Sequence, residues 1–290
     1  GGRFTWGVTG EPVYLPSGRE PLLYVGSRRG VPHHPRPGYR LAGTDAAGPR
    51  FFTAQALPDG PLDLRRTLWP LLEKELAFAY YRELLTAHPE RTRMDWAELE
   101  AAFATEEWGG TAMRALIRRA VPKHADRLNL DRLDRPLHGI RFGDLAGLQR
   151  WMHGYMAADL ARRSDPEHSA DLAMIHRLLA VYRVVAELPA ERVAADPWFH
   201  GFCGFLAGGA TCSRYAMLLA LARAGVVTFL GAGLRVEPAD SGRGWRATSR
   251  TVPESVEARA LIEARPPLPA VDRPAVPMLA GLWRRLDAAA

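Results

Sequence analysis

Apolar residues recur at helical spacing through the middle of the chain. Between residues 62 and 87 they fall on one face with charges between them, which is typical of an amphipathic helix that buries that face. Further helical patterns follow, bounded by capping residues, prolines or glycines. They begin after Asp95 and cover 111–121, 145–163, 170–188 and 212–224.

Both ends of the chain show a different period. Short apolar runs at Val13–Leu15 and Leu22–Val25 are bounded by turn residues, and the second predicts a buried strand. Near the other end, Val226–Leu230 is a continuous β-branched and apolar run, which also predicts a strand. Further strands are expected at 234–237, 245–248 and 256–263, followed by a short amphipathic segment at 278–286.

This order of elements predicts an α+β or α/β fold in which a large helical insertion interrupts one domain. We expect a β-rich segment over residues 1–60, a helical domain over 61–224 and a β-rich return segment with a short C-terminal helix over 225–290. No internal repeat of fixed period is visible, which argues against a solenoid.

Composition narrows the class of protein. Of 290 residues, 47% are hydrophobic and 24% charged, which favours a globular protein over a disordered one. No apolar run reaches the roughly 20 residues of a membrane helix, and no signal peptide is recognisable, so we expect a cytoplasmic protein. All but two of the 38 basic residues are arginine. They are interspersed with acids rather than clustered, so nucleic-acid binding is not expected.

The two cysteines do not predict a metal centre. Cys203 and Cys212 lie in a glycine-rich apolar segment, with His200 nearby. A structural zinc ion requires four ligands, and no fourth residue has a recognisable spacing. We expect two buried thiols.

A basic, glycine-containing loop follows the strand predicted at Leu22–Val25. Backbone N–H groups and guanidinium forks in such a loop suit phosphate oxygens. The alternative is a set of solvated surface arginines. The candidate phosphate-binding residues are Arg19, Ser27, Arg28, Arg29 and Gly30.

Two adjacent histidines continue this segment. His33 and His34 lie between Pro32 and Pro35, which favour an extended backbone. As groups that titrate near neutrality, they are candidates for acid/base work beside a cofactor or substrate. The alternative interpretation is a pair of exposed loop histidines.

Several segments together resemble a family of large actinobacterial flavoproteins described as FAD/NAD(P)-binding proteins. The first reads SGREPLLYVGSRRGVPHH, and the match extends along nearly the whole chain. The segments that carry it are 17–34, 68–85, 143–160, 214–237 and 247–282.

The resemblance implies part of an FAD-dependent, NAD(P)H-linked oxidoreductase, monooxygenase-like, that acts on a small-molecule substrate. The phosphate at Arg28 and Arg29 would then belong to the FAD pyrophosphate or to the 2′-phosphate of NADPH. The resemblance identifies no catalytic residue. The G-x-G-x-x-G turn that such flavoproteins carry is missing, so we expect the chain to correspond to the middle portion of a longer flavoprotein.

Other interpretations remain open. The passage Trp198–Gly209 joins aromatic residues to glycines; it suits the lining of a substrate or flavin pocket, and equally a buried helix. The helical region can also serve as a non-catalytic binding or assembly module. A third possibility is a small-anion binder built on Arg28 and Arg29.

Overall fold

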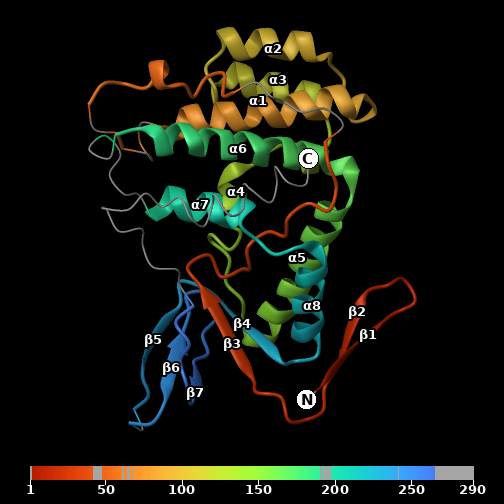
Figure 1. Ribbon diagram of the computed structural model, residues 1–290, viewed down its shortest axis with the longest axis vertical. Coiled ribbons are helices and arrows are strands. Elements are labelled where there is room, and N and C mark those ends of the chain that lie inside the picture. The colour runs from red at the N-terminus through yellow and green to blue at the C-terminus, as the bar shows by residue number, and fades with distance from the viewer. Residues whose placement is uncertain are drawn as a thin grey trace. The chain divides into compact units, whose positions relative to one another are not determined.

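The computed structural model describes residues 2–41, 48–60, 62–63, 66, 68–189, 192, 197–240 and 242–264. Within them the chain forms both helices and strands (Figure 1). It divides into two compact units, each assembled from segments far apart in the sequence. The strand unit comprises Gly1–Gly38, Asp131–Ser164 and Gly209–Pro266, and the described part of the helical unit lies in Tyr39–Leu130 and Asp165–Gly208.

The strand unit contains three small sheets and two long helices. An antiparallel hairpin is formed by β1 (Arg3–Trp6) and β2 (Pro12–Leu15). A parallel pair joins β3 (Leu23–Ser27) to β4 (Val227–Ala232). The antiparallel sheet β5-β6-β7 is formed by Arg235–Pro238, Trp245–Thr248 and Val256–Ala258.

The helices of this unit are α5 (Leu145–Ser164) and α8 (Cys212–Arg223), which lie side by side (Figure 1). The carboxylate of Asp144 accepts the N–H of Gly147 at 2.6 Å, as a helix-capping side chain does. The hydroxyl of Thr211 similarly accepts the N–H of Arg214 at the start of α8. Both helices pack against β4.

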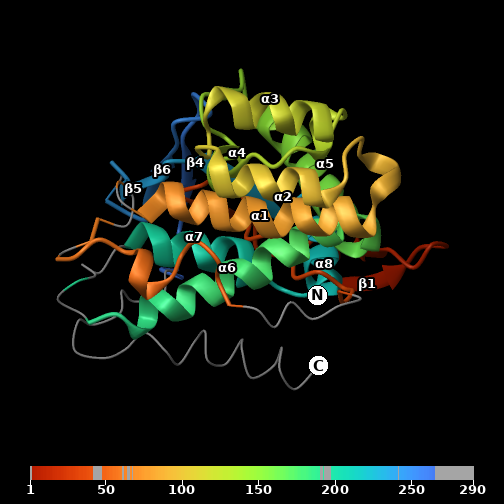
Figure 2. The same cartoon turned by 90° about the horizontal axis from the view of Figure 1, so that it is seen from above.

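The helical unit is built around α1 and α6, which run alongside each other in both views (Figures 1 and 2). Pro70 occupies the first turn of α1, where its missing N–H is not needed. Short 3₁₀ turns connect the longer helices. The α-helices of this unit include α1 (Trp69–Ala87), α2 (Trp96–Thr105), α3 (Thr111–Ala120), α6 (Ser169–Glu187) and α7 (Pro197–Ala207). The short α4 (Leu130–Asp134) has Leu130 in this unit and its other residues in the strand unit.

A fully buried carboxylate anchors the chain that precedes α1. Glu75 accepts the N–H groups of Arg50 at 3.0 Å, Phe51 at 2.6 Å and Phe52 at 3.0 Å. The guanidinium of Arg177 on α6 lies 3.2 Å from the same carboxylate, and its side chain is 4% exposed. Because a buried charge is costly without partners, this set of contacts ties the 50–52 segment to α1 and α6.

The helices do not form the single block that we expected over residues 61–224. The structure places α5 and α8 in the strand unit, because their buried faces pack on β4 and on each other. Helical periodicity reveals that a face is buried and is silent about which element covers it. β3, near the start of the chain, pairs with β4, which begins at Val227.

Two strand predictions are wrong in detail. The strand at Leu22–Val25 is not buried: β3 covers Leu23–Ser27, with Leu23 43% and Val25 41% exposed. The strand expected over 256–263 ends at Ala258, where its pairing with β6 ends. The amphipathic segment predicted at 278–286 lies outside the described residues. Among the described residues no helix combines the length and apolarity of a membrane span.

Candidate functional site

The turn from Ser27 to Gly30 lies at the carboxyl end of β3, beside the carboxyl end of β4. The hydroxyl of Ser27 accepts the N–H of Gly30 at 2.9 Å, and the carbonyl of Arg28 accepts the N–H of Gly233 at 3.3 Å. The carboxyl ends of adjacent parallel strands are where open α/β sheets bind ligands. The Ser27–Gly30 turn therefore lies at the end of the strand pair where such sheets bind ligands.

Glycine is required at position 30. Its φ is +80°, in the left-handed region that only glycine adopts without strain. A Cβ built there would lie 2.3 Å from the backbone nitrogen of Ala232 and 2.4 Å from the carbonyl carbon of Gly231. The backbones of the two loops thus approach more closely than any side chain permits.

The two adjacent arginines of this turn have different environments. The guanidinium of Arg29 lies 2.5 Å from the carboxylate of Asp134 and donates to the Asp134 carbonyl at 2.9 Å. Asp134 is buried and the Arg29 side chain is 14% exposed. Arg28 is exposed. Arg29 is therefore committed to holding the turn, and Arg28 is the arginine that the turn presents to solvent.

Arg19 lies in a separate turn organised around a carboxylate. The side chain of Glu20 accepts backbone N–H groups from Ser17 at 2.7 Å, Gly18 at 2.9 Å and Arg19 at 3.1 Å. The hydrogen bond from the Ser17 amide is the main cause that lowers the pKa of Glu20 to about 2. Because these amides already face an anion of the chain itself, they are not directed at an external phosphate.

The two histidines also differ from each other. His33 is exposed, but His34 is 3% exposed and its Nδ1 lies 2.9 and 3.0 Å from the two carboxylate oxygens of Asp159. The interpretation of both as exposed loop residues is therefore wrong for His34. A polar partner far along the chain, on α5, compensates its burial.

Asp159 is the centre of a buried polar cluster in the strand unit. The hydroxyl of Tyr215 on α8 donates to its carboxylate at 3.3 Å, and Nε of Arg163 lies 3.7 Å away. Burial, and next the charge of Asp159, raises the pKa of both Tyr155 and Tyr215. Both phenols therefore stay protonated through the physiological range, and that of Tyr215 donates the hydrogen bond to Asp159.

The backbone packing around His34 indicates a structural role for this cluster. A Cβ at Gly209 would lie 1.8 Å from the His34 carbonyl oxygen, so the two chains touch. The N–H of Arg36 donates to the Ala210 carbonyl at 2.8 Å, and the N–H of Gly38 to the Arg163 carbonyl at 3.0 Å. His34 and Asp159 thus fasten the segment after the Ser27–Gly30 turn to α5 and to the start of α8.

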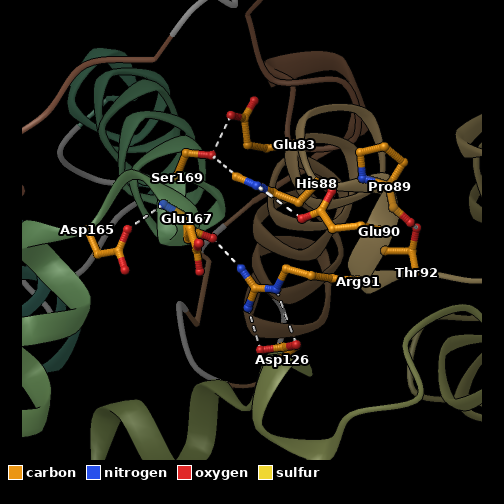
Figure 3. A network of polar contacts seen from close by, with 10 residues as sticks. All are labelled: Glu83, His88, Pro89, Glu90, Arg91, Thr92, Asp126, Asp165, Glu167 and Ser169. Carbon is orange, nitrogen blue, oxygen red and sulfur yellow. Dashed lines mark hydrogen bonds and ion pairs between the residues drawn. The ribbon is translucent and has the colours of Figure 1, made fainter.

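A second polar network, in the helical unit, escaped the sequence analysis (Figure 3). The Nε2 of His88 lies 2.8 Å from the hydroxyl of Ser169, which lies 2.6 Å from the carboxylate of Glu83. Serine, histidine and acid together resemble a hydrolase triad. Here, however, the serine hydroxyl has its proton directed at Glu83 and is 7% exposed. It therefore cannot serve as a nucleophile activated by His88.

The same network joins the ends of α1 and α6. Arg91, just after α1, donates to the carboxylate of Asp126 and to the carbonyl of Glu167 (Figure 3). Glu167 in turn donates its N–H to the side chain of Asp165 at 2.9 Å. The network thus ties helix ends together. The only signal in the sequence was the presence of charged residues next to predicted helix ends.

The aromatic passage that starts at Trp198 is part of the core. It forms helix α7, in which Phe199, Phe202 and Phe205 are 4%, 0% and 1% exposed. The ring of Trp69 packs edge-to-face on Trp198 with centroids 5.0 Å apart. The core-packing interpretation of these phenylalanines is therefore confirmed.

The two cysteines are thiols that form no disulfide. Cys203 is buried and Cys212 half-buried. The thiol of Cys212 points at the carbonyls of Arg36 and Arg163, at 3.2 and 3.7 Å. Within the described ranges, no three His, Cys, Asp or Glu side chains gather as metal ligands do.

The chain is similar to characterised enzymes along almost its whole length. It is 35% identical over 304 aligned positions to an L-aspartate N-monooxygenase (nitrosuccinate-forming) of Streptomyces davaonensis, in a match that covers 96% of this chain and 45% of that enzyme. It is 34% identical to the enzyme of the same name from Streptomyces cremeus, in a match that covers 93% of this chain and 43% of that enzyme. Both relatives are nitrosuccinate-forming enzymes.

A fungal enzyme extends the comparison. Nitrosuccinic acid synthase npaA of Aspergillus oryzae is 29% identical over 98% of this chain and 45% of its own length. The chain thus spans less than half the length of these relatives. No model of a known protein family matches the chain. The two Streptomyces relatives agree with the actinobacterial part of the expected resemblance.

Proposed function

We propose that this chain is part of an N-monooxygenase that oxidises the amino group of L-aspartate or a closely related amino acid. The observation that supports it is the similarity over 93–98% of the chain to three nitrosuccinate-forming enzymes. Because the chain covers at most 45% of them, the activity is assigned to a longer protein that contains this sequence. Its fold would be part of a flavoprotein nucleotide-binding domain with a helical insertion.

The proposed enzyme uses FAD and NADPH. A nicotinamide supplies hydride and a flavin supplies oxygen chemistry when bound, while the protein contributes binding, orientation and electrostatics. The Ser27–Gly30 turn suits the phosphate of such a dinucleotide because it lies at the carboxyl ends of two parallel strands. The exposed Arg28 supplies a positive charge there.

The residues of this turn have separate tasks in the proposal. Arg28 binds a dinucleotide phosphate, because a guanidinium offers a fork of donors matched to phosphate oxygens. Arg29 is a positioning residue that holds the turn through Asp134. His34, buried against Asp159, positions the segment that follows and does not exchange protons with a substrate.

The test uses the full-length protein. Purified protein is assayed for flavin absorbance near 450 nm (roughly the value of any oxidised flavin), then for NADPH oxidation that depends on added L-aspartate, with the product identified as nitrosuccinate by mass spectrometry. D-aspartate and L-malate, which lacks the amino group, are the controls. A colourless folded protein that neither binds FAD nor consumes NADPH would overturn the proposal in favour of a non-catalytic module. A flavoprotein that turns over a different amino acid would overturn only the substrate.

A further inference from the structure

The two outer edges of the parallel β3–β4 pair are not equivalent. On the outer side of β4, the side-chain amide of Gln149 donates to the Phe229 carbonyl at 2.8 Å and accepts the Phe229 N–H at 2.9 Å. Gln149 thus supplies the two hydrogen bonds that a neighbouring strand would make at this residue. Helix α5 therefore closes the sheet at the β4 edge.

In the described part of the chain β3 pairs with β4 alone, and no side chain is seen to bond its outer edge as Gln149 bonds that of β4. The N–H of Leu23 donates to the Val226 carbonyl at 2.9 Å. Because backbone groups alternate in direction along a strand, Tyr24 and Gly26 then direct theirs away from β4. Such a row of outward donors and acceptors is a template for another strand.

The side chains of β3 point to the same conclusion. Leu23 is in register with Val227, and Val25 with Phe229. The two β4 residues are 4% and 3% exposed, whereas Leu23 and Val25 are 43% and 41% exposed. On this face of the sheet, the β4 side chains are thus buried and the β3 side chains are exposed.

The residues of β3 do not discourage another strand from pairing with its outer edge, and the sheet has only two strands. The sequence Leu-Leu-Tyr-Val-Gly at residues 22–26 contains no proline and no charge, which are two of the devices that keep natural edge strands from pairing. Parallel sheets also occur almost only with covered faces and more than two strands. An exposed two-stranded parallel pair with an apolar edge is therefore an incomplete sheet.

We propose that β3 is an interior strand in the full-length protein, and that its outer edge pairs with a strand from a part of that protein outside residues 1–290. The relatives offer the necessary length, since the matched region is only 43–45% of each. The added strand would bond to Tyr24 and Gly26 and place apolar side chains over Leu23 and Val25. The inference concerns the sheet alone and does not depend on the reaction catalysed.

Hydrogen exchange in the full-length protein tests the pairing. The amides of Tyr24 and Gly26 are expected to exchange roughly 100-fold or more slowly than in an unstructured peptide, as those of internal strands do. The amide of Val8, at the exposed β1–β2 turn, is the fast-exchanging reference. Fast exchange at Tyr24 and Gly26, in a protein whose β4 amides are protected, would overturn the proposal.

A photo-cross-linking residue in place of Val25 identifies the occupant. A cross-link to a peptide outside residues 1–290 of the same molecule is the expected result. A cross-link to residues 265–290, or one between two copies whose yield rises with protein concentration, would overturn the assignment. As a matched pair of variants, Val25→Lys is expected to lower the unfolding temperature of the full-length protein, because it places a charge in a covered position, whereas Val8→Lys leaves it unchanged. Equal, negligible effects of the two would also contradict the proposal.

Discussion

The guanidinium of Arg29 lies 2.5 Å from the carboxylate of Asp134, a residue 105 positions further along the chain. Its neighbour Arg28 is exposed at the same turn. The two arginines are adjacent in the sequence and chemically identical, but their different environments give them different roles in the turn. Arg29 contributes to the stability of the turn, and Arg28 remains available to a ligand.

Replacing each arginine separately distinguishes these contributions. In the full-length protein, Arg28→Ala is expected to raise the Kd for the dinucleotide by about tenfold or more, the loss of one charge-assisted hydrogen bond, without changing the unfolding temperature. Arg29→Ala is expected to cost about 2 kcal/mol of unfolding free energy, because it removes the guanidinium that lies 2.5 Å from the buried Asp134 carboxylate.

Binding of NADPH, NADH and FAD to Arg28→Ala, compared with a control variant, identifies the phosphate that Arg28 contacts. If Arg28→Ala weakens NADPH but not NADH, Arg28 contacts the 2′-phosphate; if it lowers FAD content instead, the pyrophosphate is the ligand. Arg118→Ala, at an exposed arginine of α3, should change neither binding nor stability. Unchanged affinity for all three dinucleotides in Arg28→Ala would contradict the phosphate site.

Gly30 and Gly18 form a matched pair, because both have φ of +80°. A Cβ added at Gly30 would lie within 3 Å of backbone atoms, whereas one added at Gly18 would have nothing within 4 Å. We expect Gly18→Ala to cost about 1 kcal/mol from backbone strain alone. Gly30→Ala should cost several times as much, as measured by urea unfolding. Equal costs for the two would show that the Ala232 loop yields without penalty.

The contacts of Glu75 predict a large loss of stability when its charge is removed. Glu75→Ala leaves three backbone N–H groups without their acceptor and removes the carboxylate that pairs with the buried Arg177, and it should cost about 3–5 kcal/mol, as for other broken buried pairs. Glu98→Ala is the control, since Glu98 pairs with Arg119 on the surface with side chains 57% and 64% exposed. Its effect should stay under about 1 kcal/mol. Chemical denaturation followed by circular dichroism measures both.

Alkaline pH should destabilise the helical unit through Tyr182. Burial, and next the neighbouring Cys203, raises the pKa of Tyr182 from 10.0 to about 12. The folded state then holds this proton more tightly than the unfolded state, so the contribution is complete below pH 10 and is lost as the pH rises from about 10 to about 12. Tyr182→Phe should make the unfolding free energy fall less steeply over this range. An unchanged slope would show that Tyr182 titrates alike in both states.

Local patterns predicted many elements correctly. The helices expected at 145–163, 170–188 and 212–224 are found within one residue of the predicted limits. Capping groups and helix-terminating residues act within a few positions of the helix end, so a single sequence contains them. The loop at Ser27–Gly30 was also predicted as a turn after a strand.

What could not be predicted depended on partners distant in the sequence. Asp159 lies 125 residues from His34 and decided that this histidine is buried, and Asp134 decided which arginine is exposed. The His88–Ser169–Glu83 network was missed for the same reason, since it joins residues up to 86 positions apart. The burial of Ser169 and its second contact, to Glu83, distinguish it from the serine of a catalytic triad.

The sequence by itself determined most of the long helices and several of the strands, and that Gly30 lies in a turn, because periodicity, capping and backbone freedom are local properties. It did not reveal the strand at Arg3–Trp6 or the short helix at Leu130–Asp134. Tertiary structure alone decided that α5 and α8 pack with β4, that Gln149 closes one edge of β4, and that β3 pairs on one side only within the described residues. Each of these depends on which faces meet after the chain has folded, and a pattern of apolar residues states that a face is buried without stating against what.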